Sequence, residues 1–236
     1  MLIALGLGAI ASEIGWKVET AQAREALGDE LGEIVGQARE RESADPCIES
    51  KLDEIAAVID KAAVTHRLPP LGAIGDPLYR TWSVGVWAST INADISSHMD
   101  RETLDNLSGV YEFVATIDSA TRDEVAAWTE LTTIVGPGRS ISDEEIRILR
   151  SALSKARTAN RVNQIAAIRI DQIVKAFDLP ANADTIAEYA TLSRARFCTP
   201  IAAPAGEHYG SAPYQGIGAK VRANPITRDD YGRERR

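Results

Sequence analysis

Two long amphipathic stretches, separated by a Gly-Pro-Gly sequence, constrain this chain more than any other feature. Along residues 100–135, apolar and small polar residues return at alternating spacings of four and three, and residues 142–179 repeat the pattern. Asp100 is a helix N-cap, and Ser142-Asp-Glu-Glu145 is a capping box. Gly136-Pro137-Gly138 separates the two stretches. The sequence therefore predicts an antiparallel hairpin of two long helices.

The middle of this predicted hairpin is polar. With the turn centred near Arg139, antiparallel pairing places Asp118 beside Asn160. We expect a polar core layer in which two arginines neutralise the carboxylate, formed by Asp118, Thr121, Asn160, Asn163, Arg157 and Arg161. A layer of this kind fixes the register of paired helices at a cost in stability. The alternative is a pocket for a small polar ligand.

A further amphipathic helix is predicted for residues 21–42, which are rich in Ala, Glu, Arg and Gln. Gly28, Gly32 and Gly36 recur every four residues along it. Each glycine costs about 1 kcal/mol relative to alanine inside a helix, so some contact must offset the loss. Glycine lets another backbone approach closely, which makes a helix-contact stripe the first explanation. Self-association along the stripe is the alternative.

Local signals divide the next part of the chain. Asp45-Pro46 predicts the N-cap and first turn of a separate helix that ends near His66. Residues 67–80, with their prolines and glycines, are expected to form an irregular connector. A short helix carrying Trp82 and Trp87 is expected to follow.

The last part of the chain carries weaker patterns. A short helix is predicted for residues 184–194, and residues 200–236 are expected to be a flexible, disordered tail. Several arginines give this tail a local positive charge, which suits solvent or anionic lipid. Aromatic residues make up 6% of a chain rich in alanine. This composition favours an all-α fold, with a helical bundle domain over residues 17–199.

The opening MLIALGLGAIAS carries no charge and admits three interpretations. A strand followed by Gly6-Leu-Gly8 imitates a dinucleotide-binding turn, but the second strand that such a site needs is missing. A buried soluble helix would show one apolar stripe, whereas this segment is apolar or small on every side. A membrane helix fits, although a span needs about 20 apolar residues. We therefore expect residues 1–16 to be a membrane anchor that is incomplete at its start.

Several segments resemble a loosely defined group of uncharacterised bacterial proteins. They are LIALG with the Trp and Ala-rich helix after it, PCIESKLDEIAAVID, RLPPLG, RTWSVGVW and VGPGRSISDEEIRILRSALSKARTANR. Members of the group carry one N-terminal membrane helix and a helical extracytoplasmic domain. In the group the apolar run begins earlier, so a late start or a fragment would explain the short anchor. The resemblance implies the bacterial inner membrane, with the bulk of the chain in the periplasm.

The two cysteines, Cys47 and Cys198, form either one disulfide or two separate thiols. The periplasmic interpretation favours the bond, because disulfides persist in oxidising compartments. Closing so long a loop stabilises by up to about 5 kcal/mol in the loop-entropy model.

No motif in the sequence points to an enzyme or a cofactor. The three histidines lie in no zinc-binding spacing, and the Gly-Pro-Gly segment lacks the Lys-Ser/Thr of a phosphate loop. The net charge of -8 disfavours nucleic acid. The sequence thus predicts a membrane-tethered periplasmic interaction or scaffolding module, whose partners are the bilayer and a protein or second copy. The alternative is a small-ligand sensor domain that uses the polar middle of the hairpin.

Overall fold

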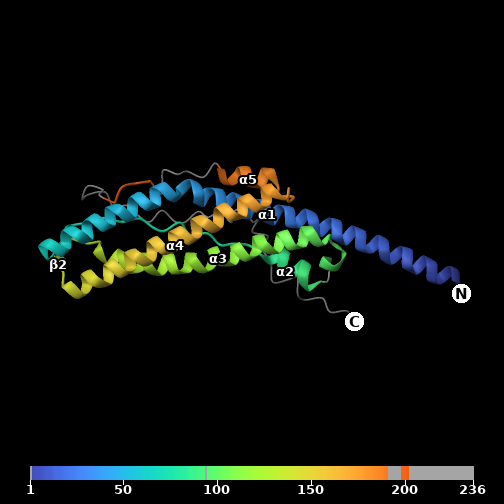
Figure 1. The fold of residues 1–236 in the computed structure, drawn as a ribbon, viewed down its shortest axis with the longest axis horizontal. Coiled ribbons are helices and arrows are strands. Elements are labelled where there is room, and N and C mark those ends of the chain that lie inside the picture. Colours follow the sequence, from blue (N-terminus) through green and yellow to red (C-terminus); the bar gives the residue numbers. More distant parts are fainter. Residues whose placement is uncertain (1, 94, 191–197, 202–236) are drawn as a thin grey trace, which may run out of the picture. The chain divides into compact units, whose positions relative to one another are not determined.

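The computed structural model describes residues 2–93, 95–190 and 198–201, with side chains described for residues 15–93, 95–189 and 198–201. These residues belong to one compact unit, residues 1–205. Three long helices and several short elements follow one another along the chain (Figure 1): α1 (Leu2–Thr65), β1 (Arg67–Leu68), α2 (Gly85–Asn92), η1 (Ile95–His98), α3 (Arg101–Leu131), η2 (Thr132–Ile134), β2 (Arg139–Ser140), α4 (Asp143–Ala176) and α5 (Ala183–Ala190). The all-α prediction is confirmed.

Helix α1 runs from Leu2 to Thr65 without a break. The segment that imitates a dinucleotide-binding strand is therefore helical. The separate helix predicted to begin at Asp45-Pro46 is wrong, because Pro46 lies inside α1. Proline in a helix costs about 3 kcal/mol. Each buried aliphatic side chain contributes about 1.5–3 kcal/mol. Buried apolar residues on both sides of Pro46 keep the helix continuous through it: Leu31, Ile34, Val35, Ile48, Leu52 and Ile55.

Helices α3 and α4 form the predicted hairpin and lie side by side (Figure 1). The Asp100 carboxylate accepts a 2.8 Å hydrogen bond from the Thr103 backbone N–H at the start of α3. Ser142 and Glu145 form the capping box of α4. Helix α3 ends earlier than predicted, at Leu131, and continues as the 3₁₀ turn η2.

A short antiparallel ladder joins the end of α1 to the hairpin turn. Arg67 pairs with Ser140 in the β1–β2 ladder, and the Leu71 N–H donates to the Gly136 carbonyl at 2.8 Å. Gly138 has a φ of +83°, and a Cβ there would lie 3.0 Å from the Leu68 carbonyl oxygen. Gly138, which the sequence places in the turn between the two long helices, thus also allows β1 to lie against this turn.

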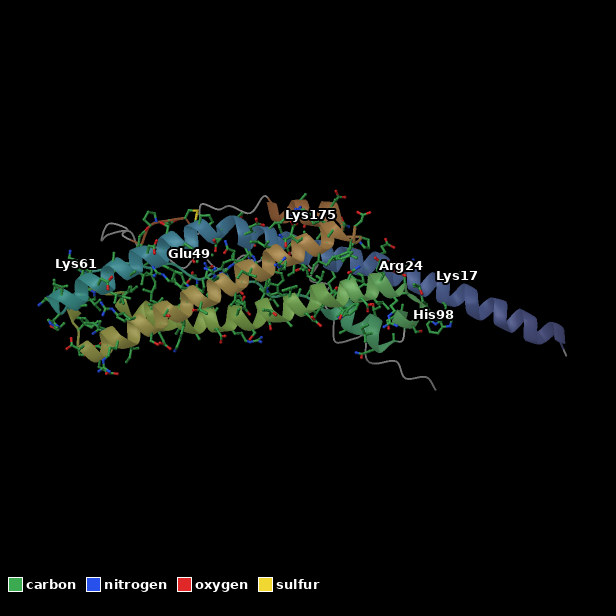
Figure 2. The ribbon with its side chains drawn as sticks, in the orientation of Figure 1. Lys17, Arg24, Glu49, Lys61, His98 and Lys175 are labelled. Carbon is green, nitrogen blue, oxygen red and sulfur yellow. A yellow bond between two sulfur atoms is a disulfide. The ribbon has the colours of Figure 1, made fainter. Side chains whose placement is uncertain are left out.

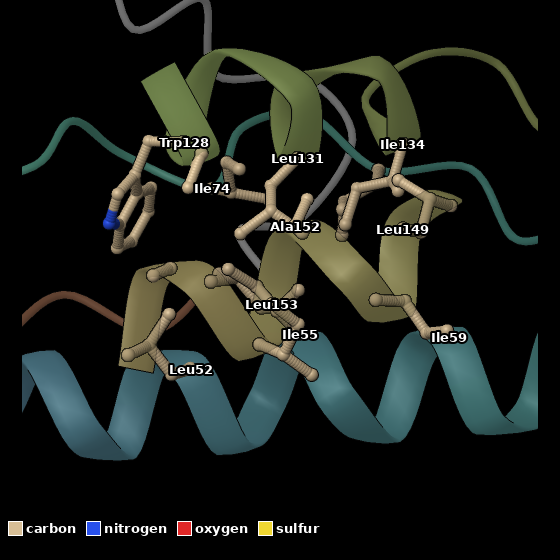
Figure 3. Close-up of a cluster of buried hydrophobic side chains, with 14 of the residues drawn as sticks. Leu52, Ile55, Ile59, Ile74, Trp128, Leu131, Ile134, Leu149, Ala152 and Leu153 are labelled. Atoms are coloured by element: carbon tan, nitrogen blue, oxygen red, sulfur yellow. The ribbon is translucent and has the colours of Figure 1, made fainter. Parts of the chain in front are cut away.

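The buried side chains form two apolar clusters along the three long helices. The turn cluster lies near the hairpin turn (Figure 3) and includes Leu52, Ile55, Ile59, Ile74, Trp128, Leu131, Ile134, Leu149, Ala152 and Leu153. The α2 cluster lies at the other end of the bundle and includes Leu31, Ile34, Leu107, Val110, Val114, Ile117, Ala167 and Ile170. A core split in this way leaves a gap in the apolar packing between the clusters.

The remaining elements differ in detail from the predictions. Trp87 lies in α2 as expected, but Trp82 precedes the helix. The last helix, α5, ends at Ala190, and the predicted continuation to residue 194 lies outside the described residues. Ile201 is buried in the turn cluster, so the predicted flexible tail does not begin at residue 200. Its remainder, residues 202–236, also lies outside the described residues.

Within the part of the chain that the structure describes, no helix combines the length and the apolar character needed to cross a membrane.

Candidate functional site

A polar layer separates the two apolar clusters. On each long helix, residues of the α2 cluster and residues of the turn cluster flank buried polar positions. These positions are Arg41 of α1, Thr121 and Glu124 of α3, and Asn160 and Asn163 of α4. Glu124 and both asparagines have no exposed surface.

An ion pair between α1 and α3 forms the centre of this layer. Arg41 Nη1 lies 2.8 Å from Glu124 Oε2, and Arg41 Nη2 donates to Glu124 Oε1 at 2.9 Å. Arg41 Nη2 also donates to Asn160 Oδ1, and Asn163 Nδ2 donates to Glu124 Oε2 at 2.9 Å. A fully buried ion pair with these additional hydrogen bonds allows only one alignment of the three helices.

The layer continues along one side of the bundle. Asn160 Nδ2 donates to Asp45 Oδ1 at 3.0 Å, and Gln164 Nε2 donates to Asp45 Oδ2 at 2.6 Å. Asn160 also donates to Glu49. These hydrogen bonds extend the polar layer from Asn160 to Asp45 and Glu49 of α1.

The predicted polar layer is correct in position and partly wrong in membership. Thr121, Asn160 and Asn163 are buried in it. Asp118 is not, since 47% of its side chain is exposed and it pairs with Arg122 one turn along α3. Arg157 pairs with Asp53 at 2.5 Å near the surface, and Arg161 is exposed. The neutralising arginine is Arg41 instead.

Neither partner of the central ion pair, Arg41 or Glu124, is among the residues predicted for the polar layer. Glu124 belongs to a second set of α3 residues that recur at spacings of four and three and are buried in the structure. The set consists of Ile117, Thr121, Glu124, Trp128 and Leu131. A Glu in a series whose other members, apart from Thr121, are apolar is a signal that could have identified it. Arg41 lies far away in sequence and carries no comparable local signal.

The glycine stripe of α1 contacts the chain between α4 and α5, and α5 itself. A Cβ on Gly28 would lie 2.6 Å from the Pro180 carbonyl oxygen, and one on Gly32 would lie 2.7 Å from that of Asn182. At Gly36 it would lie 2.5 Å from the Tyr189 ring. Within the described chain, an intramolecular contact therefore occupies this face of α1.

Cys47 and Cys198 form a disulfide that links residues 151 positions apart in sequence. Figure 2 shows its sulfur atoms beside α1, near Glu49. Three residues further along, the Ile201 N–H donates to Glu54 Oε2 at 2.8 Å. The disulfide and this hydrogen bond hold residues 198–201 along α1.

A second buried carboxylate, Glu30 of α1, lies at the N-terminus of α2. Glu30 accepts hydrogen bonds from the N–H groups of Val86 at 2.8 Å and Trp87 at 3.0 Å. The Tyr111 hydroxyl donates to it at 2.6 Å. Burial, together with the hydrogen bond to Glu30 and the negative charge of that carboxylate, raises the pKa of Tyr111 well above its usual range. No Lys or Arg among the described residues pairs with Glu30.

Next to this carboxylate, an open groove of about 470 Å³ lies between α3 and the segment around the start of α2. Its aromatic wall consists of Trp82, Trp87 and Tyr111, and α3 contributes Glu112 and Asp118. The rings of Trp87 and Tyr111 stack with their centroids 4.7 Å apart. The groove therefore combines aromatic surface with two carboxylates.

The described residues include no group of three or more His, Cys, Asp or Glu side chains placed to hold a metal ion. Of the described histidines, His66 lies 3.6 Å from Asp143 at the surface and His98 stacks on Trp16. No protein-family model matches the chain, and neither a curated protein nor a solved structure is significantly similar to it.

Proposed function

We propose that this chain is a membrane-tethered helical interaction module. Its apolar first twelve residues insert into a lipid bilayer, and the bundle presents a rigid surface to a protein partner or a second copy. The continuity of α1 from Leu2 to Thr65 carries this proposal. A segment that is apolar on every side needs apolar surroundings around its whole circumference. Since the same helix continues into the core of the bundle, any attachment at its start positions the whole domain.

The bundle suits a scaffolding role because its parts are held in one arrangement. The buried ion pair of Arg41 and Glu124 fixes the alignment of the helices, and the β1–β2 ladder fixes the hairpin turn against α1. A rigid surface binds a partner with little loss of conformational entropy.

The disulfide supports an extracytoplasmic position for the bundle. Disulfides form and persist in oxidising compartments such as the bacterial periplasm and are rare in the cytosol. We therefore propose that the bundle lies in the periplasm, with the anchor in the bacterial inner membrane. Protein alkylated in intact cells before extraction should show Cys47 and Cys198 joined in peptide mass spectra. Two alkylated thiols would overturn this assignment.

Vesicle flotation of the full chain tests the tether. The chain should float with vesicles of phosphatidylethanolamine and phosphatidylglycerol, whereas Leu5→Asp with Ile10→Asp should remain in the aqueous fraction. Each aspartate at the centre of a membrane segment costs about 2.5–3.5 kcal/mol. Val18→Asp is the matched control, because Val18 lies on α1 beyond the apolar run and is exposed. Circular dichroism monitors folding, and equal flotation of all three chains would overturn the tether.

A further inference from the structure

We propose that the groove lined by Trp82, Trp87 and Asp118 binds a small quaternary ammonium compound of the choline type. This assignment is independent of the membrane tether, since every lining residue belongs to α3 or to the segment around α2. The volume of about 470 Å³ falls in the range of small-molecule sites.

The aromatic wall favours a cation. The electron-rich face of a tryptophan or tyrosine ring attracts a positive charge within about 6 Å of its centroid, and cages of such rings are a recurrent way to bind quaternary ammonium groups. Trp82 and Trp87 are both partly exposed beside the groove. Tyr111 donates a hydrogen bond to Glu30 and stacks on Trp87, so it holds the Trp87 ring in place beside the groove.

The charges around the groove also favour a cation. Glu112 and Asp118 line it from α3, and the buried Glu30 lies behind the aromatic wall with no basic partner among the described residues. Arg122 is the cation nearest in sequence, and it pairs with Asp118. Because an exposed pair spaced by four residues contributes only about 0.3–0.5 kcal/mol, a ligand can compete with it for the carboxylate.

The aromatic side of the groove distinguishes a quaternary ammonium from a primary amine, because the polar side chains of the lining other than Tyr111, which are Ser108, Glu112 and Asp118, all lie on α3. A primary ammonium has three N–H donors that need acceptors once water is displaced. A trimethylammonium group has none, and its methyl groups pack against the rings. The carboxylates of α3 then balance its charge.

Binding of choline to the full chain, measured by calorimetry in a nonionic detergent, tests the proposal. Choline should bind, and 3,3-dimethyl-1-butanol, which has the same shape without the charge, should bind at least about tenfold more weakly. Glycerophosphocholine should also bind more weakly than choline, because its phosphate meets Glu112 and Asp118. No binding of choline, or equal affinity for the neutral analogue, would overturn the proposal. Equal affinity for glycerophosphocholine would overturn the assignment to a free cation and indicate a lipid headgroup.

Variants locate the site. Trp82→Leu should weaken choline binding by about tenfold and Asp118→Asn by about threefold, the latter mainly at low salt. Asp105→Asn is the matched control, since Asp105 is an exposed carboxylate of α3 outside the groove and should leave binding unchanged. If Trp82→Leu lowers the helical signal, Asp118→Asn decides the result alone. Wild-type affinity in folded Asp118→Asn would overturn the site.

Discussion

Glu124 and Glu30 are both buried carboxylates, but the molecule neutralises them differently. Glu124 faces Arg41 in a two-contact ion pair at the centre of the polar layer. Glu30 is held by two peptide N–H groups and the Tyr111 hydroxyl. Dipoles stabilise a negative charge without cancelling it. Glu124 thus belongs to a layer in which its charge is neutralised, whereas Glu30 keeps its negative charge beside an open groove.

The largest effect is expected at the ion pair. Glu124→Leu should lower the free energy of unfolding by about 3–5 kcal/mol, because it leaves the Arg41 charge buried without a partner. Urea denaturation measures the change. Arg41→Leu with Glu124→Leu should recover most of the loss, since no uncompensated charge remains. A double variant as unstable as the single one would show that the layer does more than pair two charges.

A smaller loss is expected at Glu30. Glu30→Gln keeps an acceptor for α2 but removes the charge that two N–H groups and the helix dipole stabilise, which should cost about 1–2 kcal/mol. The same variant should weaken choline binding, whereas Glu124→Leu with Arg41→Leu should not. Glu25→Gln is the control, because Glu25 is exposed on the same helix. A loss as large as that of Glu124→Leu would remove the distinction between the two carboxylates.

The pH dependence of the free energy of unfolding should probe the contact between Tyr111 and Glu30 separately from the ion pair of Arg41 and Glu124. Folding raises the pKa of Tyr111, so the unfolded chain loses the proton first as the pH rises. The contribution of Tyr111 is therefore complete below about pH 10 and falls by about 1.4 kcal/mol for each pH unit above it. Thermal unfolding at pH 9 and pH 11 should show a larger loss for the wild type than for Tyr111→Phe. Equal losses would contradict the assigned cause.

The smallest effect on stability is expected at Asp118, where the sequence predicts a buried charge but the structure shows an exposed one. Asp118→Leu should change stability by no more than about 0.5 kcal/mol, because exposed ion pairs contribute little. A loss above about 2 kcal/mol in urea denaturation would mean that Asp118 belongs to the polar layer after all.

The sequence predicts the hairpin well because its signals are local. The four and three spacings and the caps at Asp100 and Ser142 act within a few residues, and they define α3 and α4 to within a few positions. At Asp45-Pro46 equally local signals are misleading. The apolar residues on both sides of Pro46 pack against α4 and the connector, and this burial outweighs the proline.

Membership of the polar layer depends on packing that local pattern does not contain. A two-helix interface buries one narrow seam, and Asp118 belongs to that seam. Because α1 packs against the hairpin as a third helix, the buried face of α3 rotates to include Ile117 and Glu124. The groove could not be predicted for the same reason, since Trp82 and Asp118 line one groove only once the chain folds back on α3.

The bond between Cys47 and Cys198 also determines how the chain carries tension. A pull between the amino end of α1 and residues beyond 201 follows the shortest covalent path, which crosses the sulfur atoms and omits everything between residues 47 and 198. The hairpin, the ladder and most of the core lie within the omitted part. Such a force would pass along α1 as far as Cys47 and then through the disulfide. The hairpin and the ladder would bear it only after the disulfide is reduced.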